Sequence, residues 1–221
     1  MQRFAVIGLG RFGSRLAMNL ASAGHDVVGI DRKIELIEDM RDRVTLAIAM
    51  DGTDEQALLM QGINHVDVAI VGIGGNFESI VMATVVLKQI GVPKVIARSV
   101  SPVSERILKS IGADEVVNPE DESADRWANR LMSPQFLKHV DLDPTHSIVE
   151  IHPPAAWVGQ NLVQLDLRAS AGLHVIAIKH RQQADADTFK IMLPNPRDPI
   201  EQDDVLVVLG EDDNLAKLPG D

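Results

Sequence analysis

The sequence predicts an α/β protein in which a doubly wound parallel sheet is followed by a small α+β lobe. Three observations predict it. A glycine-rich turn stands between an apolar strand and a helix near the start of the chain. Six apolar segments then alternate with helical ones as far as Val117, the pattern of a parallel sheet covered by helices. After His139 the helices give way to short strands with turns between them.

The first strand, Phe4–Ile7, leads through Gly8-Leu9-Gly10-Arg11-Phe12-Gly13 into a helix expected to end near Ala23. Gly8 allows the sharp turn, Gly10 lets the backbone approach a phosphate, and Gly13 lets the helix press on the sheet. A second strand ends at Asp31, whose carboxylate can accept hydrogen bonds from ribose hydroxyls. This spacing is the fingerprint of a Rossmann-like fold, and the alternative is a glycine turn without a ligand.

The following elements repeat the alternation. In order, we expect a helix over 33–42, a strand over 45–49, a helix over 55–62 capped by Thr53 or Asp54, a strand over 66–71, a helix over 77–90, a strand over 94–97, a helix over 102–112 and a strand over 115–117.

Ligands of such sheets bind beyond the carboxyl ends of the strands, where five segments of this chain should surround one pocket. That convergence predicts a nucleotide site. The candidate binding residues are Gly8, Gly10, Arg11, Phe12, Gly13, Asp31, Arg32, Asp51, Gly52, Thr53, Gly72, Gly74, Asn76 and Arg98.

Composition narrows the class of protein. The chain has 221 residues, a formal charge of −11 and no cysteine. The negative charge disfavours nucleic acid and anionic lipid as partners, and the missing cysteines exclude disulfides and thiolate zinc sites. The first strand begins at once and no apolar run approaches the 18 or so residues of a membrane span. We therefore expect a cytoplasmic protein that reaches a membrane only through a partner.

The segment from Glu120 to about His139 is predicted to be helical, with Trp127, Leu131, Phe136 and Leu137 as its large apolar residues and Pro134 interrupting it. It either folds back on its own domain or reaches a second subunit as an arm.

A linker is expected over 139–146, and strands over 147–151, 174–180, 189–193 and 205–209. The predicted domains are therefore a nucleotide-binding domain with its helical arm over 1–138 and a small lobe over 139–221.

The candidate site carries groups for binding rather than for reaction. Without tyrosine, the Tyr–Lys pair of short-chain reductases is impossible, and the histidines show no metal-like spacing. Arg11 and Arg98 could each bond a phosphate bidentately, which suits ATP or ADP as well as NAD(H), or could simply be solvated. Glu120, next to Asp121 and Glu122, is either a cation ligand or part of an acidic helix start.

The sequence resembles the cytoplasmic regulatory subunits of bacterial Trk and Ktr potassium-uptake systems, which are built from RCK domains. The likeness covers essentially the whole chain. It rests on Val6–Gly13, Asp31, Asp51-Gly52-Thr53, Ile111–Glu120, Asp166-Leu167-Arg168 and Ile176–His180.

The resemblance implies a homodimer that assembles into an octameric ring under a membrane potassium-translocating subunit of the TrkH or KtrB type. ATP would favour one shape of the ring, and ADP or NAD(H) another. Arg11 would reach a terminal phosphate, and Glu120 would help to hold Mg²⁺, Ca²⁺ or Na⁺ between subunits, although the family often has histidine where this chain has Asn118. Cyclic di-AMP would bind the C-terminal lobe, with Arg168 as its candidate contact.

Two other functions stay open on the residues alone. The fingerprint by itself also suits a small NAD(P)-dependent oxidoreductase, which would need a proton-transfer residue that the sequence does not offer. The other alternative is a purely structural oligomerisation module whose pocket binds no ligand.

Overall fold

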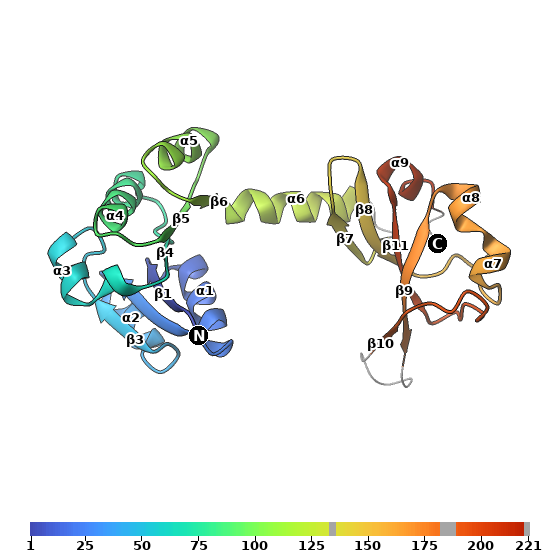
Figure 1. Ribbon diagram of the computed structural model, residues 1–221, viewed down its shortest axis with the longest axis horizontal. Helices are drawn as coiled ribbons and strands as arrows, with labels where there is room; N and C mark the ends of the chain where they lie inside the picture. Colours follow the sequence, from blue (N-terminus) through green and yellow to red (C-terminus); the bar gives the residue numbers. More distant parts are fainter. Residues whose placement is uncertain (133–135, 182–188, 219–221) are drawn as a thin grey trace. The chain divides into compact units, whose positions relative to one another are not determined.

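The computed structural model describes residues 1–132, 136–181 and 189–218, which form two compact units, Met1–Glu122 and Ser123–Asp221 (Figure 1). The first unit holds a parallel sheet of six strands in the order β3-β2-β1-β4-β5-β6. This is the order of a doubly wound dinucleotide fold, and it confirms the predicted fold class. The strands are β1 (Arg3–Ile7), β2 (Asp26–Asp31), β3 (Leu46–Ala49), β4 (Val68–Val71), β5 (Lys94–Arg98) and β6 (Glu115–Val117).

Helices cover both faces of this sheet, as the near-continuous apolar strands predict. Along β1, Phe4 and Val6 pack in one core and Ala5 and Ile7 in the other, because successive side chains of a strand point to opposite faces. The first of these cores includes residues of α1 and α2, and the second includes residues of α3, α4 and α5. The helices are α1 (Arg11–Ser22), α2 (Ile34–Met40), α3 (Glu55–Met60), the short η1 (Ile63–His65), α4 (Phe77–Gln89) and α5 (Pro102–Ser110).

Local signals in the sequence set the starts of these helices. Asp54 accepts a hydrogen bond from the N–H of Ala57 and so caps α3, and Asn76 caps α4 in the same way through Ser79. Helix α5 begins with a reciprocal capping box between Ser101 and Ser104. Helix α1 differs, because its first residue follows Gly10, which has no side chain to cap it.

The second unit contains an antiparallel sheet of five strands in the order β10-β9-β11-β8-β7. Its core includes Val149, Leu173, Leu206 and Val208. The strands are β7 (Lys138–Asp141), β8 (His146–Ile151), β9 (His174–Arg181), β10 (Phe189–Met192) and β11 (Val205–Glu211), and the short helices are α7 (Leu162–Leu165), α8 (Leu167–Ala171) and α9 (Asp212–Leu215). The predicted α+β lobe is thereby confirmed.

Two expectations for the middle of the chain are wrong. Helix α6 (Pro119–Met132) ends before Phe136, which is buried in the core of the second unit. The expected linker over 139–146 includes most of β7, which pairs with β8 as an edge strand. Pairing with a neighbouring strand satisfies backbone groups that a linker would leave to water. The predicted break at Pro134 lies outside the described residues.

Within the described ranges, no helix combines the length and the apolar character that crossing a bilayer requires.

Candidate functional site

The turn between β1 and α1 is packed as its glycines predict. Gly8 has a φ of +93°, which favours glycine, and a Cβ there would lie 2.7 Å from the backbone nitrogen of Ile73. A Cβ on Gly13 would lie 1.9 Å from the carbonyl oxygen of Gly8. Both glycines therefore allow backbone segments to touch, and the first turn of α1 lies directly against the end of β1.

Gly10 is different from Gly8 and Gly13. Its backbone angles, φ −64° and ψ −172°, are open to any residue, and no described atom lies within 4 Å of the place that its Cβ would take. Neither conformation nor packing within the chain requires a glycine here. What the missing side chain provides is free space in front of the first N–H groups of α1, which have no acceptor within the helix.

The second glycine-rich turn, Gly72–Asn76, meets the first. A Cβ on Gly72 would lie 3.2 Å from the carbonyl oxygen of Gly8 and 3.6 Å from Cδ1 of Phe12. Phe12 packs against the core of the first unit, so its ring supports the turn. Asn76 already uses its side-chain oxygen to cap α4. The two turns thus lie in contact, and both Phe12 and Asn76 support the fold, one by packing on the core and the other by capping α4.

Asp31 lies at the end of β2 and is hydrogen-bonded to both neighbouring loops. One carboxylate oxygen accepts the N–H of Leu9 in the glycine turn at 2.8 Å, and the other accepts the N–H of Lys33 at 2.9 Å. A carboxylate offers about four acceptor positions, so further positions remain for ribose hydroxyls. The contact with Leu9 was not expected from the sequence.

Asp51 organises the loop after β3. It accepts hydrogen bonds from the backbone N–H of Thr53 at 2.9 Å, from its hydroxyl at 2.7 Å and from Arg32 at 2.7 Å. Burial opposes the charge on Asp51, but the bonds from Arg32 and Thr53 outweigh it and hold the pKa of Asp51 below its usual value. A Cβ on Gly52 would lie 2.2 Å from the side chain of Ile7, so this loop lies tight against the end of β1.

Arg98 and Glu120 form an ion pair with each other within the first unit. The Arg98 side chain is only 16% exposed, and one of its guanidinium nitrogens would lie 3.0 Å from a Cβ on Gly74. Its Nε is buried and has no hydrogen-bond partner among the described residues. From the sequence, Arg98 is expected to bind a phosphate and Glu120 a cation; in the structure the two side chains bind each other.

Arg11 is the first residue of α1, and its exposed side chain has no hydrogen-bond or ion-pair partner in the described part of the chain. No contact within the described chain fixes the position of its guanidinium. In the second unit Arg168 is likewise exposed, on α8.

Five segments that are far apart in the sequence thus meet at the carboxyl edge of the first sheet. The two glycine turns touch, Asp31 bonds the first turn, Arg32 pairs with Asp51, and Arg98 lies beside Gly74. His25 lies just before β2, at the opposite edge of the sheet, and packs against Phe4. The arrangement offers N–H donors, arginines and acceptors for hydroxyls, which are groups for binding an anion with a sugar.

Comparison with known proteins covers both units. Residues 4–119 match the TrkA-N domain family, and residues 146–218 match the TrkA-C domain family. The chain is 32% identical over 217 residues to the Ktr system potassium uptake protein C of Bacillus subtilis, with 98% of this chain and 96% of the relative covered. It is 30% identical to the Ktr system potassium uptake protein A of the same organism, with 98% and 95% covered.

Solved structures share the fold. The crystal structure of the GsuK RCK domain superposes with a TM-score of 0.63 and 17% identity over 98% of this chain and 46% of that chain. The GsuK channel bound to NAD gives a TM-score of 0.61 and 16% identity over 97% and 38%. This chain therefore spans less than half of either GsuK chain.

Proposed function

The chain belongs to the family of the Ktr and Trk system potassium uptake proteins, and from that premise we propose that it is a nucleotide-sensing regulatory subunit of a potassium-uptake system. It binds a nucleotide at the carboxyl edge of the six-stranded sheet without consuming it. The bound nucleotide changes the shape of the assembled subunits, and that change controls a membrane potassium-translocating partner.

The observation that carries the nucleotide is the space beside Gly10. The start of α1 presents N–H groups with no side-chain cap and no acidic residue in the first turn. Such a helix start carries a partial positive charge and stabilises an anion. Glycine at position 10 leaves room for a phosphate to approach these N–H groups, which would explain a glycine that neither backbone conformation nor packing requires.

The other residues of the edge extend the ligand on both sides of that phosphate. Asp31 accepts hydrogen bonds from the ribose, with its carboxylate already oriented by Leu9 and Lys33. Arg32, Asp51 and Thr53 line the loop beyond it. We propose ATP and ADP as the ligands, with NAD(H) as the alternative that shares the adenosine and its phosphates.

Arg98 and Glu120 suit a ligand with more than one phosphate. While no ligand is present, each side chain balances the charge of the other. A terminal phosphate bound by the Arg98 guanidinium competes with the Glu120 carboxylate for the same donor. Glu120 is then released to bind a cation, for which Mg²⁺, Ca²⁺ and Na⁺ are the candidates. Arg11 reaches over the terminal phosphate, of its own ligand or that of a neighbouring subunit.

Regulation follows from linkage. A nucleotide shifts an equilibrium between two shapes only as far as its affinity for them differs. A tenfold preference supplies about 1.4 kcal/mol per site, and several sites in one assembly add. We propose a homodimer that builds an octameric ring, located in the cytoplasm at the inner face of the membrane through its partner.

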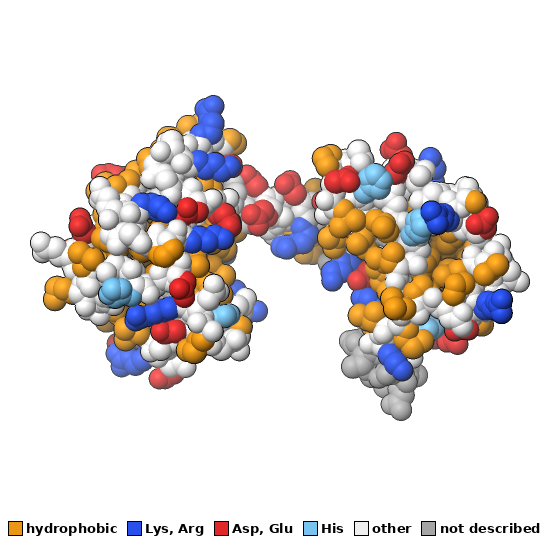
Figure 2. Space-filling view, viewed as in Figure 1, with side chains coloured by type: hydrophobic (Ala, Val, Ile, Leu, Met, Phe, Trp, Pro, Cys, Tyr) orange, Lys and Arg blue, Asp and Glu red, His pale blue; other side chains and the backbone are white. Residues whose placement is uncertain are grey.

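The surface is consistent with association. Large apolar side chains are exposed on the second unit, including Ile176 on β9 and Ile191 on β10, and Figure 2 shows hydrophobic side chains gathered on its visible face. Leu131 and Met132 at the end of α6 are exposed as well, which suits an arm that packs on another subunit.

Calorimetric titration of the full chain with ATP, ADP and NADH, each with and without Mg²⁺, tests the proposal. We expect one nucleotide per chain, no consumption of nucleotide, and a sedimenting mass well above that of the monomer. Arg11→Gln should weaken ATP binding, whereas Arg15→Gln, which removes another exposed arginine of α1, should not.

Absence of heat and an unchanged melting temperature with all three nucleotides would contradict the proposal. Steady oxidation of NADH with a small carbonyl compound would favour the alternative, a small NAD(P)-dependent oxidoreductase, which the glycine turn and Asp31 also suit. Disruption of the gene in its host should impair growth at low external potassium.

A further inference from the structure

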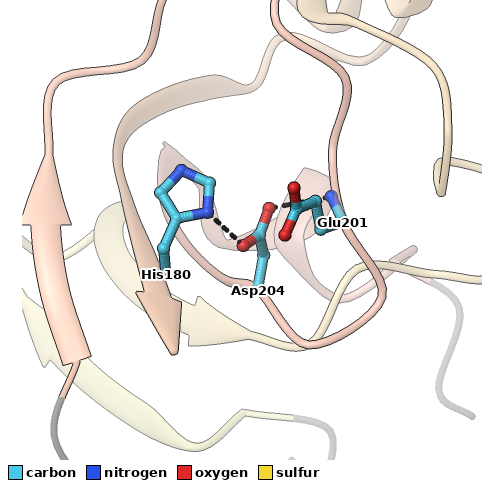
Figure 3. A group of neighbouring side chains, drawn as sticks. All are labelled: His180, Glu201 and Asp204. Atoms are coloured by element: carbon cyan, nitrogen blue, oxygen red, sulfur yellow. Dashed lines mark hydrogen bonds and ion pairs between the residues drawn. The ribbon is translucent and has the colours of Figure 1, made fainter. Parts of the chain in front are cut away.

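Three side chains of the second unit that lie far apart in the sequence converge on one point. His180 lies near the end of β9, and Glu201 and Asp204 lie in the connection that leads to β11. One ligand atom of each lies within 4.8 Å of the other two. Figure 3 shows the imidazole and the two carboxylates directed toward one another.

Asp204 is the buried member of this group. It is only 1% exposed, and its Oδ2 accepts the N–H of Glu201 at 2.8 Å. Its Oδ1 is buried and receives no hydrogen bond, although Nδ1 of His180 lies 2.5 Å away. A buried carboxylate is costly unless a donor or a cation balances its charge, so this position suits a cation.

The neighbouring basic residues do not supply that cation. Lys179 precedes His180 on β9 and forms its ion pair with Glu150 at 2.7 Å. Lys190, opposite His180 in the register of β10, is exposed. In the described ranges, no lysine or arginine forms an ion pair with Asp204 or Glu201. Protonated His180 could balance one carboxylate, but not the second.

We propose that His180, Glu201 and Asp204 bind one divalent transition-metal ion, of the class of Zn²⁺ or Mn²⁺. One imidazole nitrogen and two carboxylate oxygens form a ligand set that such ions accept, with water in the remaining positions. Ligand atoms about 2.0–2.2 Å from a metal lie roughly 3.4 Å apart in a tetrahedral site. The site therefore needs His180 and Asp204 to separate by about 1 Å and the exposed side chain of Glu201 to close in.

The ion would link β9 to the connection before β11, which already contributes a buried residue to the core. Ile200, next to Glu201, is 1% exposed, and its backbone exchanges hydrogen bonds with Gly159 and Gln160 at 2.9 Å each. A metal here would hold the connection at Glu201 and Asp204. It would also stabilise the second unit, because an ion that binds only the folded state raises the free energy of unfolding.

Calorimetry of the full-length, tag-free, chelator-treated protein with ZnCl₂ and with MnCl₂, in the absence of nucleotide, tests the site. We expect one ion per chain and a higher melting temperature for the loaded protein. Outer-shell partners of a metal are worth 10–100-fold in affinity, so removal of a direct ligand by Glu201→Gln or His180→Gln should cost at least about 100-fold.

Asp203→Asn is the matched control, because it removes a neighbouring exposed carboxylate outside the group and should leave the affinity unchanged. Glu120→Gln should also leave it unchanged, which separates this site from the cation proposed beside the nucleotide. Since Glu201 is exposed, its variant remains folded and keeps the test decisive. The proposal would be overturned if neither Zn²⁺ nor Mn²⁺ bound. It would also be overturned if Glu201→Gln and His180→Gln bound the ion as tightly as the unmodified protein does.

Discussion

Replacement of Gly10 by aspartate should stabilise the free protein and weaken its binding of nucleotide. An aspartate fits the backbone angles of Gly10, and its Cβ meets no described atom within 4 Å. Its carboxylate can cap α1, which now lacks a side-chain cap, and its charge suits the positive end of the helix. The same carboxylate occupies the place proposed for a phosphate. The two effects therefore have opposite signs.

The magnitudes follow from these contacts. The cap adds a few tenths of a kcal/mol and the charge at the helix start about 0.3–1 kcal/mol, so the melting temperature of the free protein should rise by about 2 °C. Two unit charges about 5 Å apart at an effective dielectric constant of about 20 repel by about 3 kcal/mol. The affinity for ATP should therefore fall by about 100-fold or more.

Differential scanning fluorimetry of the free protein and calorimetry with ATP measure the two effects. Gly10→Asn is the matched control, because it caps the helix without the charge and should lose less affinity than the aspartate variant. Unchanged ATP affinity in Gly10→Asp would refute the placement of the phosphate at the start of α1. A large loss of stability would show instead that Gly10 serves the fold.

Three further predictions concern the same unit. Gly13→Ala places a Cβ 1.9 Å from the carbonyl oxygen of Gly8, so the free energy of unfolding in urea should fall by about 3 kcal/mol; an unchanged midpoint would mean that α1 does not pack on the turn. Asp51 has a lowered pKa, so its ionised form stabilises the fold above its ordinary value of 3.8 and that contribution is lost as the pH falls through the lowered pKa. Asp51→Asn should therefore be less stable than the unmodified protein at pH 6, with a difference that shrinks below about pH 4 in thermal melts; a difference independent of pH would contradict this. Ser101→Ala removes half of a capping box and should cost about 1 kcal/mol, measured by thermal melting with Ser110→Ala, outside the box, as its control.

The fold of the first unit could be predicted because its signals are local. The strands are short apolar runs, and α3 and α4 begin after residues that cap them, Asp54 and Asn76. Alternation of such segments leaves few topologies open. The edge strand β7 escaped prediction because only His139 of its four residues is partly buried, and Asp141, Asp143 and Pro144 read as a loop.

The candidate site could be predicted as a set of positions but not as a set of contacts. The rule that ligands bind at the carboxyl ends of parallel strands brings Asp31, Asp51 and Arg98 to one edge. Nothing in the sequence shows that Arg98 pairs with Glu120, because that contact depends on how the strand end and the start of α6 face each other. The group of His180, Glu201 and Asp204 has no motif either, since the connection before β11 alone brings its members together.

The two hydrogen bonds of Asp31 decide how its part in binding can be measured. A replacement without a side-chain acceptor, such as Asp31→Ala, would also remove the hydrogen bond from Leu9, so the loop that faces the phosphate would loosen together with the loss of a sugar contact. Chemical change of the ligand avoids that confusion. Comparison of ATP with its 2′-deoxy and 3′-deoxy forms on the unaltered protein isolates the binding energy of each hydroxyl. Mutagenesis would instead measure the loss of the hydroxyl contact and the loosening of the loop together.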